Sequence, residues 1–267
     1  MSYRLLAIDL DGTLLDDNVG ISTRNYRAIK MAQEKGVKVT IATGRPFKSC
    51  LPYARKLAVD IPFITYHGAL VRSLELKEPL LYNPVDFDLA CDVVETAEKL
   101  GYHINLYIDD RVHIREENSF SRMYQDITAV EVLPVGNLYT FLANEKKAPP
   151  KLTIIDFEGR LEKMESFLYE NYREKLTITK SHQNFLEITH LKATKGQALK
   201  SLVDILNVEQ DEVMAFGDSY NDIDMLQYAG MGVAVANAPR EVQEKADFIT
   251  RSHLEDGVAE VIEEYII

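Results

Sequence analysis

The chain has 267 residues, enough for one large domain or two modest ones, and its 46% hydrophobic and 27% charged residues are ordinary for a soluble globular protein. Its formal net charge of -12 argues against nucleic acid as the main partner, because that affinity comes mostly from clustered Lys and Arg. No apolar stretch approaches the ~20 residues that cross a bilayer, and no export signal is visible at the N-terminus. We therefore expect a cytoplasmic protein with no membrane partner, whose Cys50 and Cys91 are free thiols.

The first third of the chain alternates short apolar runs with longer amphipathic stretches. We predict strands at Leu5–Leu10, Val37–Ala42 and Pro62–Tyr66, and helices at Ser22–Lys35 and Phe47–Ala58. Ser22 can cap the first helix, and Gly36 ends it just before the next strand. Continuous apolar strands that alternate with helices are typical of a parallel sheet covered on both faces.

From about residue 84 to residue 190 the order of elements is less regular. We expect helices at Phe87–Leu100 and Leu161–Tyr172, and strands at His103–Ile108, Val112–Arg115, Lys151–Phe157, Leu176–Thr179 and Phe185–Thr189. Hairpins mixed with helices indicate an α+β unit. The alternating pattern then returns, with strands at Val213–Phe216, Val233–Ala236 and Asp247–Thr250 and helices at Lys195–Leu206, Asp222–Tyr228 and Arg240–Lys245. The sequence thus predicts an α/β core made of residues 1–83 and 191–267, with an α+β domain inserted at 84–190.

Polar side chains follow three of the predicted core strands. The first strand ends on Asp9 and Asp11, the second on Thr43-Gly44-Arg45, and the fourth on the run Gly217–Asp222. Asp and Gly are common where strands stop, so the first strand alone leaves an ordinary strand end and a functional site about equally plausible. Because ligands of open parallel sheets bind beyond the carboxyl ends of the strands, the three ends together favour a functional site.

The carboxylates of this edge predict a metal. Four of them cannot all be ionised and close together without a counter-charge: Asp9, Asp11, Asp218 and Asp222. Mg²⁺ takes oxygen ligands of this kind, and it would also give an anionic substrate a positive centre in an acidic protein. Zinc would prefer His or Cys ligands, and the six histidines and two cysteines show no such spacing.

Lys195 is the second predicted cation. It stands at an expected helix N-terminus just after the insert, where the helix dipole disfavours a lysine unless an anion is near. A phosphate group suits such a position, and Thr43 with Gly44 would add a hydroxyl and backbone N–H donors. The segment has neither the spaced glycines of a nucleotide-binding loop nor those of a dinucleotide-binding turn.

These segments resemble the four ordered motifs of the haloacid dehalogenase superfamily. The motifs are "DLDGT" (Asp9–Thr13), "ATGR" (Ala42–Arg45), "TKG" (Thr194–Gly196) and "GDSYND" (Gly217–Asp222). The stretches Gly232–Thr250 and Glu255–Ile262 are similar to the Cof-type phosphatases of that superfamily. The place and size of the insert match the large C2B-type cap of that subgroup. The resemblance implies a Rossmann-like core that carries the chemistry and a cap that confers specificity.

The resemblance also implies residue roles in a two-step phosphoryl transfer. Asp9 would be the nucleophile that forms an aspartyl-phosphate, and Asp11 the general acid and then the base. Mg²⁺ would be held by the carboxylates of Asp9 and Asp218 and by the backbone carbonyl of Asp11. Phosphate contacts are expected from Leu10, Thr43, Gly44, Lys195 and Asn221. Supporting positions are expected for Asp222, Arg45 and His67, of which His67 departs from the Asn that Cof-type proteins usually carry there.

The function expected from this resemblance is Mg²⁺-dependent hydrolysis of small phosphate monoesters, such as sugar phosphates, flavin mononucleotide or pyridoxal phosphate, by a monomer or small homo-oligomer. Two alternatives stay open. One is a phosphotransferase or mutase on the same core, and the other a phospho-accepting signalling protein or sugar-phosphate sensor that barely turns over. An acid/base residue at Asp11 favours turnover over the sensor. His67 either faces the substrate or only shapes a turn.

Overall fold

The computed structural model describes residues 3–76, 78–128, 130–182 and 184–267, and the chain divides into two compact units. Unit 1 comprises residues 1–44, 50–81 and 194–267, and unit 2 comprises residues 45–49 and 82–193. The predicted insert, 84–190, lies inside unit 2. Within the described residues, no helix is long and apolar enough to cross a membrane.

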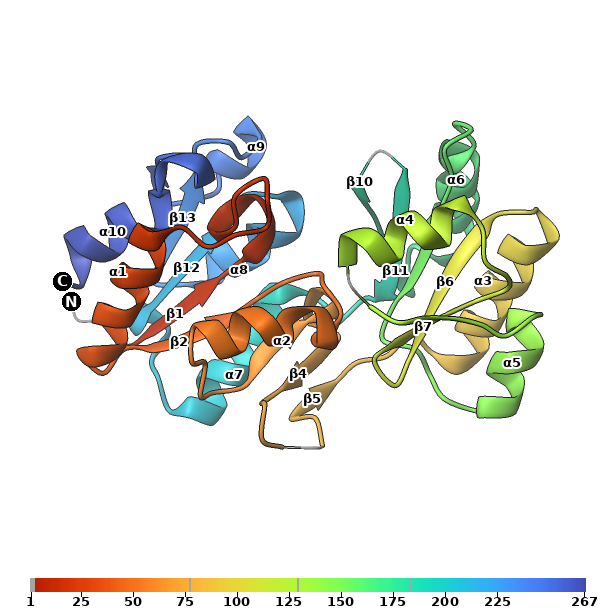
Figure 1. Cartoon of the computed structure of the whole chain (residues 1–267), viewed down its shortest axis with the longest axis horizontal. Helices are drawn as coiled ribbons and strands as arrows, with labels where there is room; N and C mark the ends of the chain where they lie inside the picture. Colours follow the sequence, from red (N-terminus) through yellow and green to blue (C-terminus); the bar gives the residue numbers. More distant parts are fainter. Residues whose placement is uncertain (1–2, 77, 129, 183) are drawn as a thin grey trace. The chain divides into compact units, whose positions relative to one another are not determined.

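Unit 1 is built on a five-stranded parallel sheet with the order β14-β13-β12-β1-β2 (Figure 1). The strands are β1 (Leu5–Ile8), β2 (Lys38–Ile41), β12 (Val213–Gly217), β13 (Met231–Val235) and β14 (Phe248–Thr250). β1 lies between β12 and β2, with Ile8 opposite Phe216 on one side and Ile41 on the other. The three strands that carry the predicted polar ends are therefore neighbours, and the predicted α/β fold class is confirmed.

Helices cover this sheet in pairs. α1 (Thr23–Glu34) packs against α10 (Gly257–Tyr265), and α7 (Lys195–Leu206) packs against α8 (Ile223–Tyr228), which contacts β12 and β13. Two more helices are α2 (Phe47–Lys56), whose first residues belong to unit 2, and α9 (Arg240–Gln243). The predicted cap of α1 is present, because Ser22 Oγ accepts from the backbone N–H of Asn25 at 3.0 Å.

The third predicted strand does not belong to the parallel sheet. β3 (Phe63–Thr65) instead joins the short strands β4 (Leu70–Arg72) and β5 (Leu81–Tyr82) in a separate three-stranded sheet. It pairs antiparallel with β4 and touches the parallel sheet through an isolated bridge between Ala42 and Ile64. Strands of two or three residues are too short for their alternation to be visible in the sequence, which explains why β4 and β5 were not predicted.

Unit 2 contains a six-stranded mixed sheet with the order β10-β11-β9-β6-β7-β8. Its strands are β6 (His103–Ile108), β7 (Arg111–Ile114), β8 (Val132–Pro134), β9 (Leu152–Ile155), β10 (Leu176–His182) and β11 (Phe185–His190). Its helices are α3 (Phe87–Lys99), α4 (Ser119–Thr128), α5 (Leu138–Glu145) and α6 (Leu161–Tyr172). The predicted hairpin is present, and Asp109 and Asp110 both adopt the positive φ that a tight hairpin turn needs.

The two faces of this sheet differ. Figure 1 shows α3, α5 and α6 on one side and α4 on the other. The apolar core of unit 2 combines residues of α3, α5 and α6 with alternate strand residues such as Ile104, Leu106 and Ile154. On the side of α4, the Tyr107 hydroxyl of β6 donates to the Tyr124 hydroxyl of α4 and lies 3.2 Å from the Thr153 hydroxyl of β9. These three hydroxyl groups form a buried polar layer.

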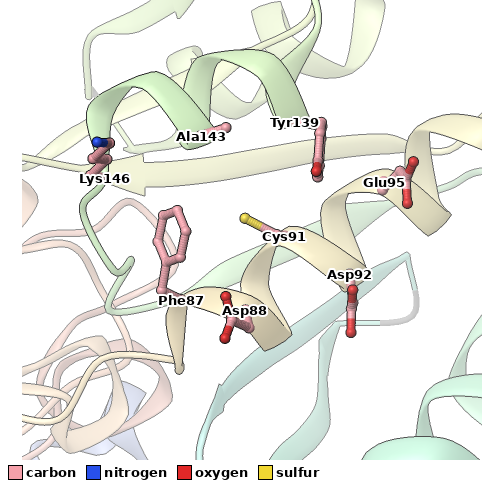
Figure 2. Close-up of a pocket in the computed structure, with 8 residues that line it drawn as sticks. All are labelled: Phe87, Asp88, Cys91, Asp92, Glu95, Tyr139, Ala143 and Lys146. Atoms are coloured by element: carbon pink, nitrogen blue, oxygen red, sulfur yellow. The ribbon is translucent and has the colours of Figure 1, made fainter.

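A shallow groove lies between α3 and α5 of unit 2 (Figure 2). Figure 2 shows Phe87 and Cys91 pointing toward α5, with Tyr139 and Lys146 on the opposite side, whereas Asp92 points away. None of the predicted site residues lines this groove. The chemistry predicted from the sequence therefore belongs elsewhere.

Candidate active site

A buried ion cluster occupies the end of β1. Asp9 follows this strand directly, and Lys195 is the first residue of α7. The Lys195 Nζ donates to Asp9 Oδ1 at 2.8 Å and to Asp222 Oδ1 at 2.6 Å, and the three side chains are at most 5% exposed. The anions that justify a lysine at this helix N-terminus are therefore two carboxylates of the protein itself.

Asp222 organises the turn that follows β12. Its Oδ2 accepts from the backbone N–H groups of Asp218 at 3.1 Å and Ser219 at 3.0 Å. Gly217 is needed beneath it, because a Cβ at that position would lie 2.5 Å from the Cβ of Asp222. Since both of its oxygens are engaged, Asp222 is placed to hold Lys195 and the turn.

Asp218 faces the turn after Asp9. Thr13 Oγ1 donates to Asp218 Oδ1 at 2.9 Å. Gly12 adopts a φ of +73°, and a Cβ there would lie 2.5 Å from Asp218 Oδ2, so both the backbone conformation and the available space require glycine. Asn237 Nδ2 donates to the carbonyl of Gly12 at 2.8 Å and fixes the turn from a third segment.

The crowding of carboxylates is visible in their pKa values. Burial raises the pKa of the Asp9 carboxyl well above its ordinary range, because Lys195 only partly opposes the effects of burial and of the neighbouring acids. Burial, with the charge of Asp222, raises the pKa of Asp218 to about 6. Burial lowers the pKa of the Lys195 ammonium, but Asp222 and Asp9 outweigh it and the net shift is upward. One lysine therefore does not balance the negative charge at this edge.

The donor set fits a hard divalent cation. One carboxylate oxygen from each of Asp9, Asp218 and Asp222 lies within 4.8 Å of the others. Oxygen ligands of this kind suit Mg²⁺, and the charge that raises the pKa of Asp9 and Asp218 is charge that a cation would offset. Because Asp222 already uses both oxygens, Asp9 and Asp218 are the carboxylates best placed to hold a metal.

The end of β2 supplies the second group of predicted residues. Thr43 is buried, its N–H donates to the Ile64 carbonyl at 3.0 Å, and its own carbonyl accepts from the His67 N–H at 3.1 Å. The His67 ring lies against Gly44, where a Cβ would be 2.2 Å from the ring Cε1. His67 Nδ1 is 2.9 Å from Asn221 Nδ2, so the ends of β2 and β12 are linked through this histidine.

Three further predicted residues differ in where the structure places them. The side chain of Asp11 is exposed, in contrast to that of Asp9. The side chain of Leu10 is fully buried in the core, so a phosphate contact from this residue would have to come from its backbone. Arg45 follows Gly44 but groups with unit 2, and its supporting role stays a prediction.

Sequence reasoning overlooked three residues that shape the site. Thr13 and Asn237 hold the turn after Asp9, and Asp224 Oδ2 accepts from the N–H of Gly196 at 2.9 Å, beside Lys195. Thr13 lies inside a motif that was already recognised, so its hydroxyl could have been considered. The residues that Asn237 and Asp224 bond are 225 and 28 positions away in the sequence, so no local pattern predicts these contacts.

Comparison with known proteins places the chain in a family. A family model described as haloacid dehalogenase-like hydrolase matches residues 6–262. A 5-amino-6-(5-phospho-D-ribitylamino)uracil phosphatase of Bacillus subtilis is 33% identical, with 100% of this chain and 97% of the relative covered. The crystal structure of a Thermotoga maritima protein superposes with a TM-score of 0.88 at 32% identity, covering 98% of this chain and 97% of the other. A sugar phosphatase of HAD subclass IIB superposes with a TM-score of 0.86 at 25% identity, covering 99% and 100%.

The chain belongs to the haloacid dehalogenase-like hydrolases. The predicted family, fold class and enzyme class, a phosphatase of this family, are confirmed.

Proposed function

We propose that the protein hydrolyses small phosphate monoesters in the cytoplasm, depends on Mg²⁺ and passes through an aspartyl-phosphate on Asp9. The observation that carries this proposal is the buried cluster of Asp9, Lys195 and Asp222 beside Asp218, at the ends of adjacent parallel strands. When bound, Mg²⁺ would offset the carboxylate charge and polarise a phosphoryl oxygen.

In the first step an Asp9 oxygen attacks phosphorus, and the bond from phosphorus to the leaving oxygen breaks. Asp11 gives its proton to that oxygen, so the alcohol leaves neutral. In the second step Asp11 takes a proton from water, the water oxygen attacks phosphorus, and the bond to Asp9 breaks. The two carboxyls lie in different environments, because Asp9 is buried against the Lys195 ammonium whereas the side chain of Asp11 is exposed. The Lys195 ammonium and a bound Mg²⁺ would both favour the ionised form of Asp9 that the attack needs.

The phosphoryl oxygens need donors, because charge accumulates on them in the transition state. We assign this role to the Lys195 ammonium, the Thr43 hydroxyl, the Asn221 amide and the backbone of Leu10 and Gly44. Lys195 is already held in place by two carboxylates, so little reorganisation would accompany the reaction. Unit 2 would act as the specificity cap.

The names of two similar proteins support a substrate class. One relative is named for 5-amino-6-(5-phospho-D-ribitylamino)uracil and a structural neighbour for sugar phosphates. We propose a phosphorylated sugar, polyol or cofactor. The test is release of inorganic phosphate from a panel of sugar phosphates, flavin mononucleotide, pyridoxal phosphate and the ribitylamino-uracil phosphate, with Mg²⁺ or EDTA.

Turnover that requires Mg²⁺ supports the proposal. An Asp11→Asn variant that still binds Mg²⁺ but has lost turnover would support the assigned backbone role of that residue in metal binding. If no substrate releases phosphate, or if phosphate moves only to an added sugar acceptor, the hydrolase proposal is wrong and the sensor or the phosphotransferase takes its place.

A further inference from the structure

His67 connects two parts of the phosphate site that come from different strands. Its backbone N–H donates to the carbonyl of Thr43 at the end of β2, and its ring packs over Gly44. Its Nδ1 accepts from the side-chain amide of Asn221, which lies beyond β12, at 2.9 Å. One buried residue thus reaches three of the predicted phosphate-site residues, Thr43 through its backbone and Gly44 and Asn221 through its ring.

The backbone holds His67 in this place at a conformational cost. Tyr66 and His67 have φ values of 51° and 58°, and Gly68 has a φ of 100°. Non-glycine residues rarely adopt such values, although Asn, Asp and His do so more often than others. A Cβ on Gly68 would lie 2.2 Å from the carbonyl oxygen of Thr194, so α7 and this turn are packed tightly together. The surrounding structure therefore over-determines the position of the ring.

The Asn221 amide is held from both ends. Its Oδ1 accepts from the hydroxyl of Ser219, and its Nδ2 donates to His67. Without the His67 acceptor, one end of this half-buried amide would lose its partner and the side chain could rotate away. The His67 ring would then no longer link Gly44 at the end of β2 to Asn221 beyond β12.

We infer that His67 is a positioning residue that fixes the Asn221 amide, and with it the phosphate-binding geometry, for the reaction proposed above. It need not touch the substrate. The inference rests on the proposed function for its kinetic meaning, but the link itself can be measured by binding of inorganic phosphate. The inference predicts that the effects of substituting residues 67 and 221 on phosphate affinity are not additive.

The experiment is a double-mutant cycle of His67→Ala and Asn221→Ala, with His67→Asn as the conservative variant. An Asn at this position places an amide oxygen on Cγ, where the imidazole carries Nδ1, and it tolerates a positive φ. The readouts are KM and kcat on the best substrate, and the Kd of inorganic phosphate with Mg²⁺ by titration calorimetry. A buried variant of unit 1 that is not among the predicted site residues, Ile262→Val, controls for general loss of stability.

We expect His67→Ala to raise KM and the phosphate Kd about tenfold, because it removes one hydrogen bond that orients a ligand group. His67→Asn should stay within about twofold of the wild type, and His67→Ala should add less than about twofold to Asn221→Ala. Equal effects of His67→Ala in both backgrounds, or a fall in kcat alone that Ile262→Val reproduces, would overturn the inference. If the wild type binds phosphate but hydrolyses nothing, the proposed function fails while the calorimetric cycle still decides the link.

Discussion

Each unit of the molecule buries a lysine, and the two lysines differ in the number of carboxylates around them. Lys195 of unit 1 is 1% exposed and bonds both Asp9 and Asp222, with Asp218 close by. Lys151 of unit 2 is 2% exposed, bonds Glu187 at 2.6 Å and lies 5.2 Å from the ring centre of Tyr107. The first cluster carries an excess of negative charge, whereas the two charges of the second pair cancel.

The difference distinguishes the proposed active site from a charge-balanced ion pair. Burying charges is costly, and a neutral pair recovers that cost only through its own attraction and hydrogen bonds. A cluster with spare negative charge remains ready to bind a cation or to share protons. Burial, together with the neighbouring acids, raises the pKa of Asp9 and of Asp218 there. A buried lysine alone does not point to an active site, but uncompensated carboxylates around one favour that interpretation.

The largest expected effect comes from the reactive cluster. Asp9→Asn removes the nucleophile but keeps the shape of the side chain, so turnover should fall by about 10⁴-fold or more with the fold retained. Steady-state kinetics and circular dichroism measure the two outcomes, with Asp60→Asn, an exposed acid, as the matched control. Substantial activity in a folded Asp9→Asn protein would contradict the assignment.

Breaking the balanced pair should affect stability instead. Lys151→Met removes the ammonium that bonds the buried Glu187 carboxylate, and we expect the free energy of unfolding to fall by about 3–5 kcal/mol. The double variant Lys151→Met/Glu187→Leu removes both charges and should recover most of that loss. Urea unfolding of the three proteins tests this, and a double variant as unstable as the single one would show that the pair stabilises unit 2 in its own right.

Metal affinity should respond to one carboxylate of the first cluster. Asp218→Asn keeps the bond to Thr13 but removes a charge from the proposed ligand set, so half-maximal activation should need about 10–100-fold more Mg²⁺. Activity against Mg²⁺ concentration after EDTA treatment measures the shift. Asp204→Asn, an exposed acid on α7, should leave the curve unchanged, and an unchanged curve for Asp218→Asn would exclude this residue as a ligand.

The sequence predicted much of this arrangement because several signals are local. The pattern at Leu161–Tyr172 has a clear helical period, and α6 has those bounds. The segment Ser119–Thr128 was not predicted as a helix, although Phe120, Met123 and Tyr124 have the i, i+3, i+4 spacing of one helical face, so a local signal was overlooked there. Helix α5 and strand β8 were missed for another reason, since α5 is short and β8 has only three residues.

The candidate site also has residues that local signals predict and contacts that they do not. Asp9, Thr43 and Asp218 were predictable because parallel topology brings the ends of adjacent strands together. The bond between His67 and Asn221 joins residues 154 apart, and only the folded chain reveals it. The left-handed turn that presents His67 depends on packing against α7, which no local propensity encodes.

The smallest expected effect concerns unit 2 and pH. His113 of β7 is 7% exposed and stacks on Phe141 of α5, and burial lowers its pKa despite a hydrogen bond to the Leu106 backbone. The unfolded chain therefore binds a proton more readily than the folded one. Stability should fall as the pH drops below the ordinary histidine value of ~6.5, by up to about 1.4 kcal/mol per pH unit from this group, and should be unaffected by it above that pH. His113→Phe keeps the stacking on Phe141 and removes the titrating group. The free energy of unfolding should therefore fall less steeply between pH 7.5 and pH 5, and the number of protons taken up on unfolding should decrease by up to one. Urea unfolding at several pH values measures the slope, and a steeper or unchanged slope in His113→Phe would mean that other groups govern the acid response.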